Sequence, residues 1–131
     1  MADEIKLRPA SAEDAGTEPF WEAARRGVLM IKRCEDCTRP HYYPRAICPH
    51  CGSDRTVWEE SAGHGTLYTL STMRRGAGTP YTLAYVVLDE GPAVLTNIVT
   101  ADHDALAIGQ RMTVRFIDTE GAPVPGFAPA G

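Results

Sequence analysis

Alternating hydrophobic and polar positions dominate the second half of the chain and predict consecutive short strands. In residues 111–117 an apolar side chain occupies every second position, which is the period of a strand with one buried face. Residues 66–73, 81–88 and 93–99 are also predicted strands, and a short helical turn is expected within residues 102–106. The longest apolar runs have about four residues, against the roughly 18 that cross a bilayer, so we expect no membrane span.

The first half of the chain has a different pattern. Residues 1–16 are polar and without periodicity, and we expect them to form a mobile arm. Thr17 and Pro19 indicate a helix start, because threonine caps helices and proline fits the first turn. The helix is predicted over residues 20–26, and Gly27 is its expected stop. Residues 28–31 and 56–60 are predicted strands on either side of a Cys-rich stretch.

All four cysteines fall within that stretch, in the spacing C-x2-C-x10-C-x2-C. Two such pairs present four thiolates that can close a tetrahedral metal site, and Gly52 suits the turn after the last of them. We predict structural zinc with no open coordination position, bound by Cys34, Cys37, Cys48 and Cys51. Iron uses the same ligand set, and the spacing does not distinguish it from zinc. Two disulfides would need an oxidising compartment, and no export signal is visible in the N-terminal residues, so we expect a cytoplasmic protein.

Charge is unevenly distributed along the chain. The net charge is −4, yet residues 25–55 contain seven basic and three acidic residues. Zinc with four thiolates carries a formal charge of −2, which Lys32, Arg33, Arg39 and Arg45 can offset. An anion-binding site is the alternative explanation of this basic segment. The acidity of the chain as a whole argues against a protein whose main role is to bind nucleic-acid phosphates.

Few other residues suggest chemistry. His41 and His50 lie near the cysteines, where we expect supporting or surface roles because four thiolates already satisfy the metal. His64 and His103 lie in predicted turns without a readable acid partner, so no nucleophilic triad can be argued. No phosphate-binding glycine motif occurs.

The segment 74–80 is a basic, glycine-rich loop between the predicted strands 66–73 and 81–88. Loops in this position flank the ligand face of OB-folds, and adjacent arginines can hold a phosphate or a carboxylate. Arg74 and Arg75 are therefore candidate ligand- or partner-binding residues. The alternative is an ordinary solvated hairpin loop.

These elements predict a mainly β protein. We expect a mobile arm, short helix and lead-in strand in residues 1–31, and a rubredoxin-like zinc ribbon in residues 32–58. Residues 59–131 are expected to form a five-stranded OB-fold barrel with a Pro/Gly-rich tail that Phe127 anchors. Either part alone would bury little surface, so metal or partner binding is expected.

The motifs also resemble a known family. The chain is similar, from about Glu18 to Pro129, to small acyl-CoA-associated proteins that join a rubredoxin-like zinc ribbon to an OB-fold, formerly a domain of unknown function. The matching features are Pro19-Phe20-Trp21, the four cysteines with Pro44-Arg45 and Gly52, Gly63-x-Gly65-Thr66, Asp89-Glu90-Gly91-Pro92, Ile108-Gly109 and Phe127-x-Pro129.

The resemblance implies a protein partner. Such proteins are similar to accessory subunits of thiolase-like enzymes, including acyltransferases and aldolases, and the implied role is to complete such a complex and to contact its CoA thioester. The chain is then not an enzyme on its own, and no catalytic residue is transferred to it. Phe20 and Trp21 are candidate interface anchors, because aromatic residues are enriched at such contacts. The alternative is that they pack the helix onto the ribbon or barrel.

Two other functions compete with the accessory role. Zinc ribbons and OB-folds also bind single-stranded nucleic acid, but that needs a basic groove with aromatic platforms, and the predicted barrel is acidic. An independent acyl-CoA enzyme would need a free nucleophile, whereas all four cysteines are assigned to the metal.

Overall fold

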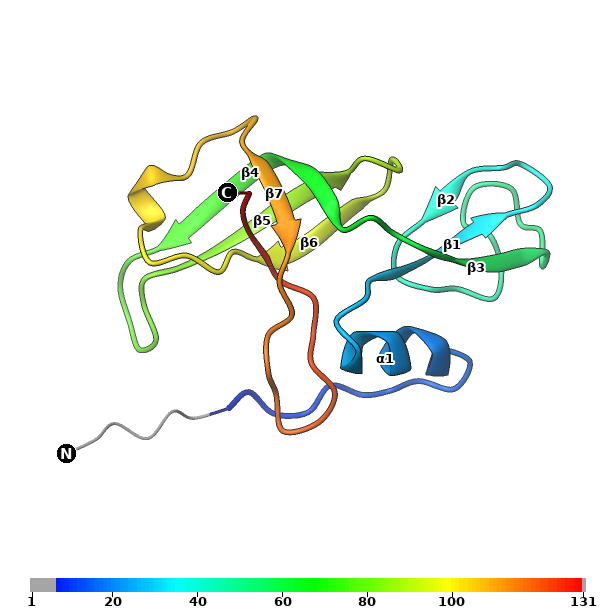
Figure 1. Ribbon diagram of the computed structural model, residues 1–131, viewed down its shortest axis with the longest axis horizontal. Helices are drawn as coiled ribbons and strands as arrows, with labels where there is room; N and C mark the ends of the chain where they lie inside the picture. The colour runs from blue at the N-terminus through cyan, green and yellow to red at the C-terminus, as the bar shows by residue number, and fades with distance from the viewer. Residues whose placement is uncertain (1–6, 131) are drawn as a thin grey trace.

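The computed structural model describes residues 7–130, as one helix, one 3-10 turn and eight strands in two sheets (Figure 1). None of its helices is long and apolar enough to cross a membrane. The elements are α1 (Glu18–Arg25), β1 (Met30–Cys34), β2 (Pro40–His41), β3 (Thr56–Glu60), β4 (His64–Met73), β5 (Tyr81–Leu88), β6 (Ala93–Asn97), η1 (His103–Ala105), β7 (Arg111–Val114) and β8 (Phe127–Pro129).

Helix α1 forms where the sequence places it, but its start differs in detail. Pro19 lies in the first turn, and Gly27 follows the helix with φ +78°. Thr17 occupies the cap position without capping, because its hydroxyl donates to the carbonyl of Asp14 instead of accepting a helix N–H. The predicted side-chain cap is therefore wrong, although the predicted helix start is confirmed.

The ribbon sheet is small and antiparallel, in the order β2-β1-β3. Lys32 in β1 is opposite His41 on one side and Trp58 on the other. The Lys32 ammonium lies 4.8 Å from the centre of the Trp58 ring, a distance suited to a cation–π contact. Trp58 packs against the main core at the end of the ribbon, as expected for a residue at the junction with the barrel.

The second sheet has the order β6-β5-β4-β7-β8, and it closes on itself. A parallel bridge joins Ile98 to Phe127, and the Val99 N–H donates to the Phe127 carbonyl at 2.7 Å. Five strands closed in this order form the predicted OB-fold barrel. Phe127 is fully buried, which confirms that it anchors the tail.

The segment 7–16 is exposed, but Arg8 holds it to the loop that follows β7. Arg8 forms a parallel bridge with Thr119, and its carbonyl accepts the Glu120 N–H at 2.8 Å. The segment expected to be a mobile arm is therefore held in place at Arg8. Residues 1–6, the rest of that expected arm, lie outside the described residues.

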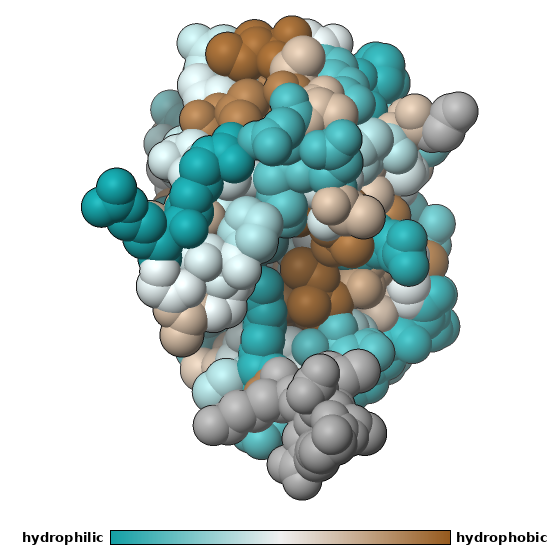
Figure 2. Space-filling model, turned by 90° about the vertical axis from the view of Figure 1, so that its left-hand side faces the viewer, coloured by the Kyte–Doolittle hydropathy of each residue, from teal (hydrophilic) through white to brown (hydrophobic). Residues whose placement is uncertain are grey.

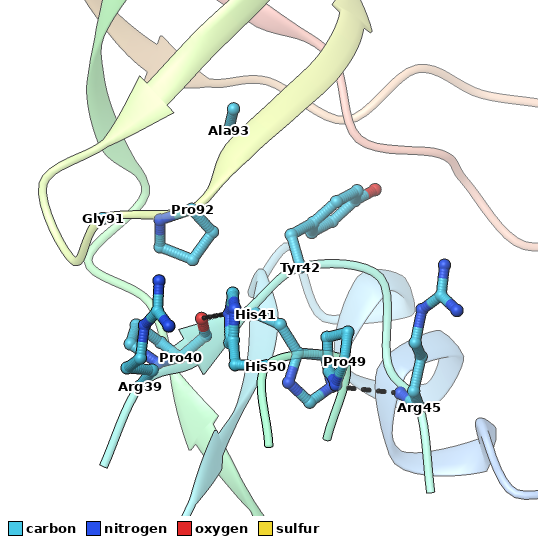
Figure 3. A pocket seen from close by; sticks show the side chains of 10 residues that line it. All are labelled: Arg39, Pro40, His41, Tyr42, Arg45, Pro49, His50, Gly91, Pro92 and Ala93. Atoms are coloured by element: carbon cyan, nitrogen blue, oxygen red, sulfur yellow. Dashed lines mark hydrogen bonds between the residues drawn. The ribbon is translucent and has the colours of Figure 1, made fainter. Parts of the chain in front are cut away.

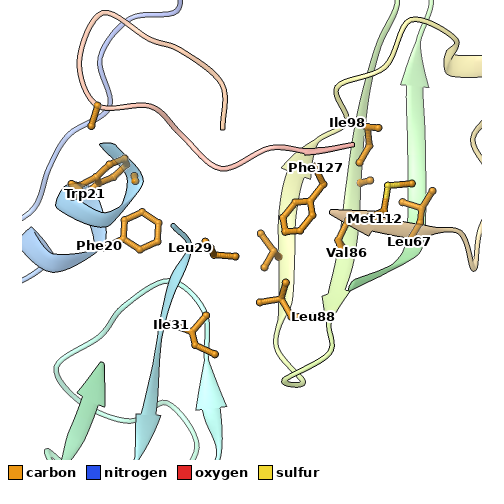
Figure 4. Close-up of a cluster of buried hydrophobic side chains, with 14 residues drawn as sticks. Phe20, Trp21, Leu29, Ile31, Leu67, Val86, Leu88, Ile98, Met112 and Phe127 are labelled. Carbon is orange, nitrogen blue, oxygen red and sulfur yellow. The ribbon is translucent and has the colours of Figure 1, made fainter. Parts of the chain in front are cut away.

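The core is shared between the ribbon and the barrel. Phe20 and Trp21 of α1, with Leu29 and Ile31 around the start of β1, belong to the same buried cluster as the barrel side chains (Figure 4). The barrel contributes Leu67, Ala84, Val86, Leu88, Val94, Ile98, Met112 and Phe127 to this cluster.

Candidate metal centre and binding surfaces

The four cysteines converge at one end of the ribbon. Cys34 ends β1, and the turn after it returns the chain to Cys37, while Gly52 adopts φ +81° just beyond Cys51. The four sulfur atoms all lie within 4.8 Å of one another. The Cys34–Cys51 and Cys37–Cys48 sulfurs are 3.6 and 3.7 Å apart, much too far for S–S bonds. Four thiols at these separations suit a tetrahedral metal ion.

Backbone N–H groups prepare these thiols for a cation. The Cys37 N–H lies 3.4 Å from the Cys34 sulfur and lowers the pKa of that thiol to about 7. Burial opposes ionisation of Cys48, but the N–H groups of His50 and Cys51 lower its pKa overall. The Ser53 N–H favours a Cys51 thiolate, yet partial desolvation and hydrogen bonds with the neighbouring sulfurs raise the pKa of this exposed thiol to about 12. A divalent cation would remove this conflict between neighbouring sulfurs.

The basic residues around the cysteines divide into two groups. Arg33 is held by Glu59, with its Nε 2.7 Å from a carboxylate oxygen, and it also donates to the Thr38 carbonyl. The Glu59 carboxylate therefore offsets the charge of Arg33. Arg39 and Arg45 form no ion pair among residues 7–130, so they remain able to offset the charge of a tetrathiolate.

Arg39 and Arg45 line a cavity of about 460 Å³ between the ribbon and the β5–β6 turn (Figure 3). They lie at opposite ends of the row of side chains, with Tyr42 and the histidines between them. His41 is 4% exposed, and its Nε2 accepts the Arg45 backbone N–H at 3.2 Å. Burial, then the charge of Lys32, lowers the pKa of His41. His41 is thus a buried residue that holds the loop, which matches the supporting role expected for it.

Phe20 and Trp21 do not form a free surface. Both are buried, Trp21 to 4% exposure, and their rings meet edge to face with centroids 4.9 Å apart. Phe20 also packs on Tyr43 at 5.4 Å. The expectation that these two side chains present an anchor to a partner is therefore wrong for the chain in this conformation, because both pack inside it. The sequence did not indicate that Tyr42 and Tyr43 join this aromatic cluster.

The predicted basic loop lies between β4 and β5. Arg74 pairs with Asp104 near η1, at 2.7 Å, and both side chains are exposed. Arg75 is exposed and forms no ion pair in the part of the chain that the structure describes. The structure brings Arg74 close to Asp104, a contact between segments 30 residues apart that the sequence pattern did not indicate.

His103 has a hydroxyl partner that local sequence did not reveal. Its Nδ1 lies 2.9 Å from the Thr82 hydroxyl, which lies 2.7 Å from the Thr72 hydroxyl. Thr82 is 21 residues away in the chain and approaches from β5. The neighbouring Asp104 is paired with Arg74, so this arrangement has no acid to complete a triad.

The outer face of β4, β5 and β6 is an exposed apolar surface. Tyr85 is opposite Leu95 on one side and Thr69 on the other, so these side chains share the face. The three strands contain no Asp, Glu, Lys or Arg. Six large side chains on this outer face are 37–63% exposed: Tyr68, Met73, Tyr81, Leu83, Tyr85 and Leu95. On the side of the molecule seen in Figure 2, hydrophobic groups also reach the surface, in separate areas bordered by hydrophilic side chains.

The fold and the cysteine cluster define a zinc-ribbon/OB-fold protein. Sequence models of the two ChsH2 domains match it: the rubredoxin-like zinc ribbon domain at residues 21–57 and the C-terminal OB-fold domain at residues 58–116. A DUF35 domain-containing scaffold protein of Methanocaldococcus jannaschii is 30% identical over 98 residues, 70% of this chain and 69% of that protein. The chain belongs to the ChsH2/DUF35 family.

Two further relatives are parts of enzymes. A chain in the solved structure of the Ltp2–ChsH2(DUF35) aldolase superposes with a TM-score of 0.81 at 30% identity, over 93% of this chain and 100% of that chain. A probable enoyl-CoA hydratase alpha subunit of Thermomonospora curvata is 32% identical over 129 residues. That match covers 95% of this chain but only 40% of the hydratase subunit, so this chain corresponds to part of the longer protein.

Proposed function

We propose that the protein is a non-catalytic accessory subunit of a thiolase-like enzyme complex that acts on acyl-CoA. The uncharged face of β4, β5 and β6 is the observation that carries this proposal. The similarity to a chain of the Ltp2–ChsH2(DUF35) aldolase supports it.

Zinc has a structural role in this proposal. Cys34, Cys37, Cys48 and Cys51 would hold the ion and leave no position for water or substrate. The ribbon sheet has a two-residue edge strand and few buried side chains of its own. Metal binding supplies about 10–16 kcal/mol to folding in comparable small peptides, and the ribbon needs such a contribution.

The outer sheet face has the composition of a protein interface. Tyrosine and methionine are enriched at interface cores, where charged residues are depleted. Tyr85 and Leu95 face each other directly across β5 and β6, so they form the centre of the surface. A thiolase-like subunit would cover this face, and aromatic side chains near its centre would contribute most of the affinity.

The experiment combines the purified chain with a thiolase-like protein encoded beside it in the genome. Leu83→Asp and Leu95→Asp each place a charge on the sheet face, and complex formation is measured by size exclusion and calorimetry. We expect each change to weaken affinity at least about tenfold, because an unpaired carboxylate would be buried. Ile108→Asp is the matched control, since Ile108 is 70% exposed but lies outside these strands. Unchanged affinity in both sheet variants, or an equal loss in the control, would contradict the proposal.

Single-stranded nucleic-acid binding is the second candidate function. Tyr68, Tyr81 and Tyr85 are exposed on a face that can stack bases in OB-folds. The three strands carry no lysine or arginine that would follow a phosphate backbone, and the chain is acidic. Fluorescence anisotropy with labelled oligonucleotides at physiological salt distinguishes the two. Tight binding that Tyr85→Ala abolishes would favour this candidate over the accessory role.

A further inference from the structure

A second cavity, of about 370 Å³, lies at one end of the barrel and borders the proposed docking face at Tyr81. Three segments form it: the start of β5 with Pro80, residues 97–103 after β6, and residues 115–117 after β7, with Arg8 of the arm beside them. The loops that follow the first and fourth barrel strands reach this end. Ligands of OB-folds bind beside those two loops.

The cavity has apolar lining residues, and backbone hydrogen bonds fix their positions. Ile98, Val99, Phe116 and Ile117 are among its lining residues. The Ile98 N–H donates to the Thr82 carbonyl at 3.0 Å, and the Ile117 N–H donates to the Val124 carbonyl at 2.8 Å. Ordinary barrel hydrogen bonds therefore fix the backbone behind these residues, so the cavity does not depend on a loose loop.

The rim of the cavity carries basic groups and no carboxylate. Arg8, Arg115 and His103 line it, and none of the other lining residues is acidic. Arg8 is positioned, because its guanidinium donates to the Asn97 side chain at 3.0 Å and its carbonyl accepts the Glu120 N–H. Arg115 forms no ion pair among the described residues. The nearby Asp104 is already neutralised by Arg74.

None of these three basic groups pairs with a carboxylate among the described residues, since Arg8 and His103 bond to the neutral side chains of Asn97 and Thr82. The arginines near the cysteines can offset the charge of a metal tetrathiolate, but residues 8, 103 and 115 are not part of the ribbon. The chain is acidic overall, with a net charge of −4. Basic groups around an apolar cavity are the arrangement that binds an anion with a hydrophobic body.

We propose that this cavity binds a small amphipathic anion, with its carboxylate or phosphate between Arg115, Arg8 and His103 and its apolar body on the wall of Ile98 and Ile117. The volume suits an apolar body of modest size, since small-molecule sites measure about 300–1,000 Å³. The proposal concerns the isolated chain and is independent of the accessory function.

The test measures binding of three probes to the full-length, zinc-loaded chain by calorimetry and by NMR. Hexanoate and phenyl phosphate carry the two possible anionic groups on an apolar body, and inorganic phosphate lacks that body. We expect saturable binding of at least one amphipathic probe, which identifies the preferred anion. Its affinity should exceed that of inorganic phosphate at least about tenfold, because the apolar body adds buried area.

Arg115→Gln and Arg8→Gln should each weaken binding of that probe about tenfold, since each removes a charge-assisted hydrogen bond to the anion. Arg26→Gln is the matched control, because Arg26 is an exposed arginine that does not line the cavity. Circular dichroism and zinc content show that each variant is folded. Absence of saturable binding, equal affinity for inorganic phosphate, or equal binding by all three variants would overturn the proposal.

Discussion

Trp21 shows at the scale of one residue how burial changes an interpretation. Its indole lies in the shared core and contacts the Phe20 ring edge to face. Trp21→Ala should therefore cost about 3–5 kcal/mol of unfolding free energy, as large-to-small changes in cores do. Thermal melting measures this loss, and Glu22→Ala, on the exposed side of the helix, is the control. An unchanged melting temperature with weaker partner binding would show instead that the helix is an interface.

The cysteines provide the second prediction at this scale. Cys34→Ser and Cys51→Ser should each lower zinc content and melting temperature together, because serine is a poor substitute for a thiolate ligand. Metal analysis of the purified variants measures the zinc bound per chain. His50→Ala should retain one zinc per chain, because His50 contacts the Pro40 carbonyl and is not one of the clustered ligands. A Cys34→Ser chain with full zinc occupancy would contradict the four-cysteine site.

The difference between these residues explains what could be predicted from the sequence. The spacing of the cysteines along the chain indicates a metal site, so these ligands were predictable without knowledge of the fold. Trp21 is buried by residues 29–31 and by barrel side chains that lie far from it in the sequence. The local pattern around Trp21 therefore could not show whether it faces a partner or the core. His103 and Thr82 illustrate the same limit, because their hydrogen bond joins segments that no local pattern connects.

At the scale of the elements, the close packing of β4 against β5 requires a glycine at position 65. A side chain on Gly65 would place its Cβ 2.6 Å from the Val87 carbonyl oxygen and 2.7 Å from a Val86 methyl group. Gly65→Ala should therefore destabilise the barrel by about 1–3 kcal/mol, the usual cost of overpacking. Chemical denaturation measures the change. Ser71→Ala, at an exposed position of the same strand, should leave stability almost unchanged, and equal stability of both variants would show that the strand shifts without strain.

The two arginines of the β4–β5 loop differ in their ion pairing. Arg74 is occupied by Asp104, whereas Arg75 is free to meet a CoA phosphate or an acidic patch on a partner. If the loop takes part in association, Arg75→Ala should slow complex formation at low salt and have less effect at high salt. Arg74→Ala should have the smaller effect. Stopped-flow measurements of association give both rates, and identical rates for Arg75→Ala and wild type at low salt would leave the loop as a simple turn.

Most strands were predictable because their alternation of apolar and polar residues is local. The strand bounds that were predicted wrongly depend on contacts between distant segments. The strands 56–60 and 81–88 occur with the predicted bounds. The strand predicted over 111–117 has regular pairing only to Val114, although Arg115 and Ile117 still exchange backbone hydrogen bonds with Gly126 and Val124 in the same antiparallel register. The two-residue strand β2 and the bridge that closes the barrel could not be predicted, because each is too short to produce a pattern in the sequence.

For the whole molecule, the ribbon and the barrel act as one folding unit. Leu29 and Ile31 are almost fully buried and lie in the cluster that contains the barrel residues Leu88 and Phe127. The Leu29 carbonyl also accepts the Ser61 N–H at 2.8 Å, which ties the start of the ribbon to the link into β4. Unfolding of the zinc-loaded chain, followed by calorimetry, should therefore be a single transition, since the buried side chains of the ribbon pack on the core of the barrel.

Zinc removal tests this dependence directly. A chelator at neutral pH should unfold the ribbon, because four thiols without a cation cannot hold the two turns together. Leu29 and Ile31 would then leave the core, and the barrel should lose about 3–6 kcal/mol, at roughly 1.5–3 kcal/mol for each buried side chain. Calorimetry follows the melting temperature, and NMR signals from β5 report on the barrel separately. Restoring zinc should recover both, whereas a barrel that melts at the same temperature with and without zinc would show two independent units.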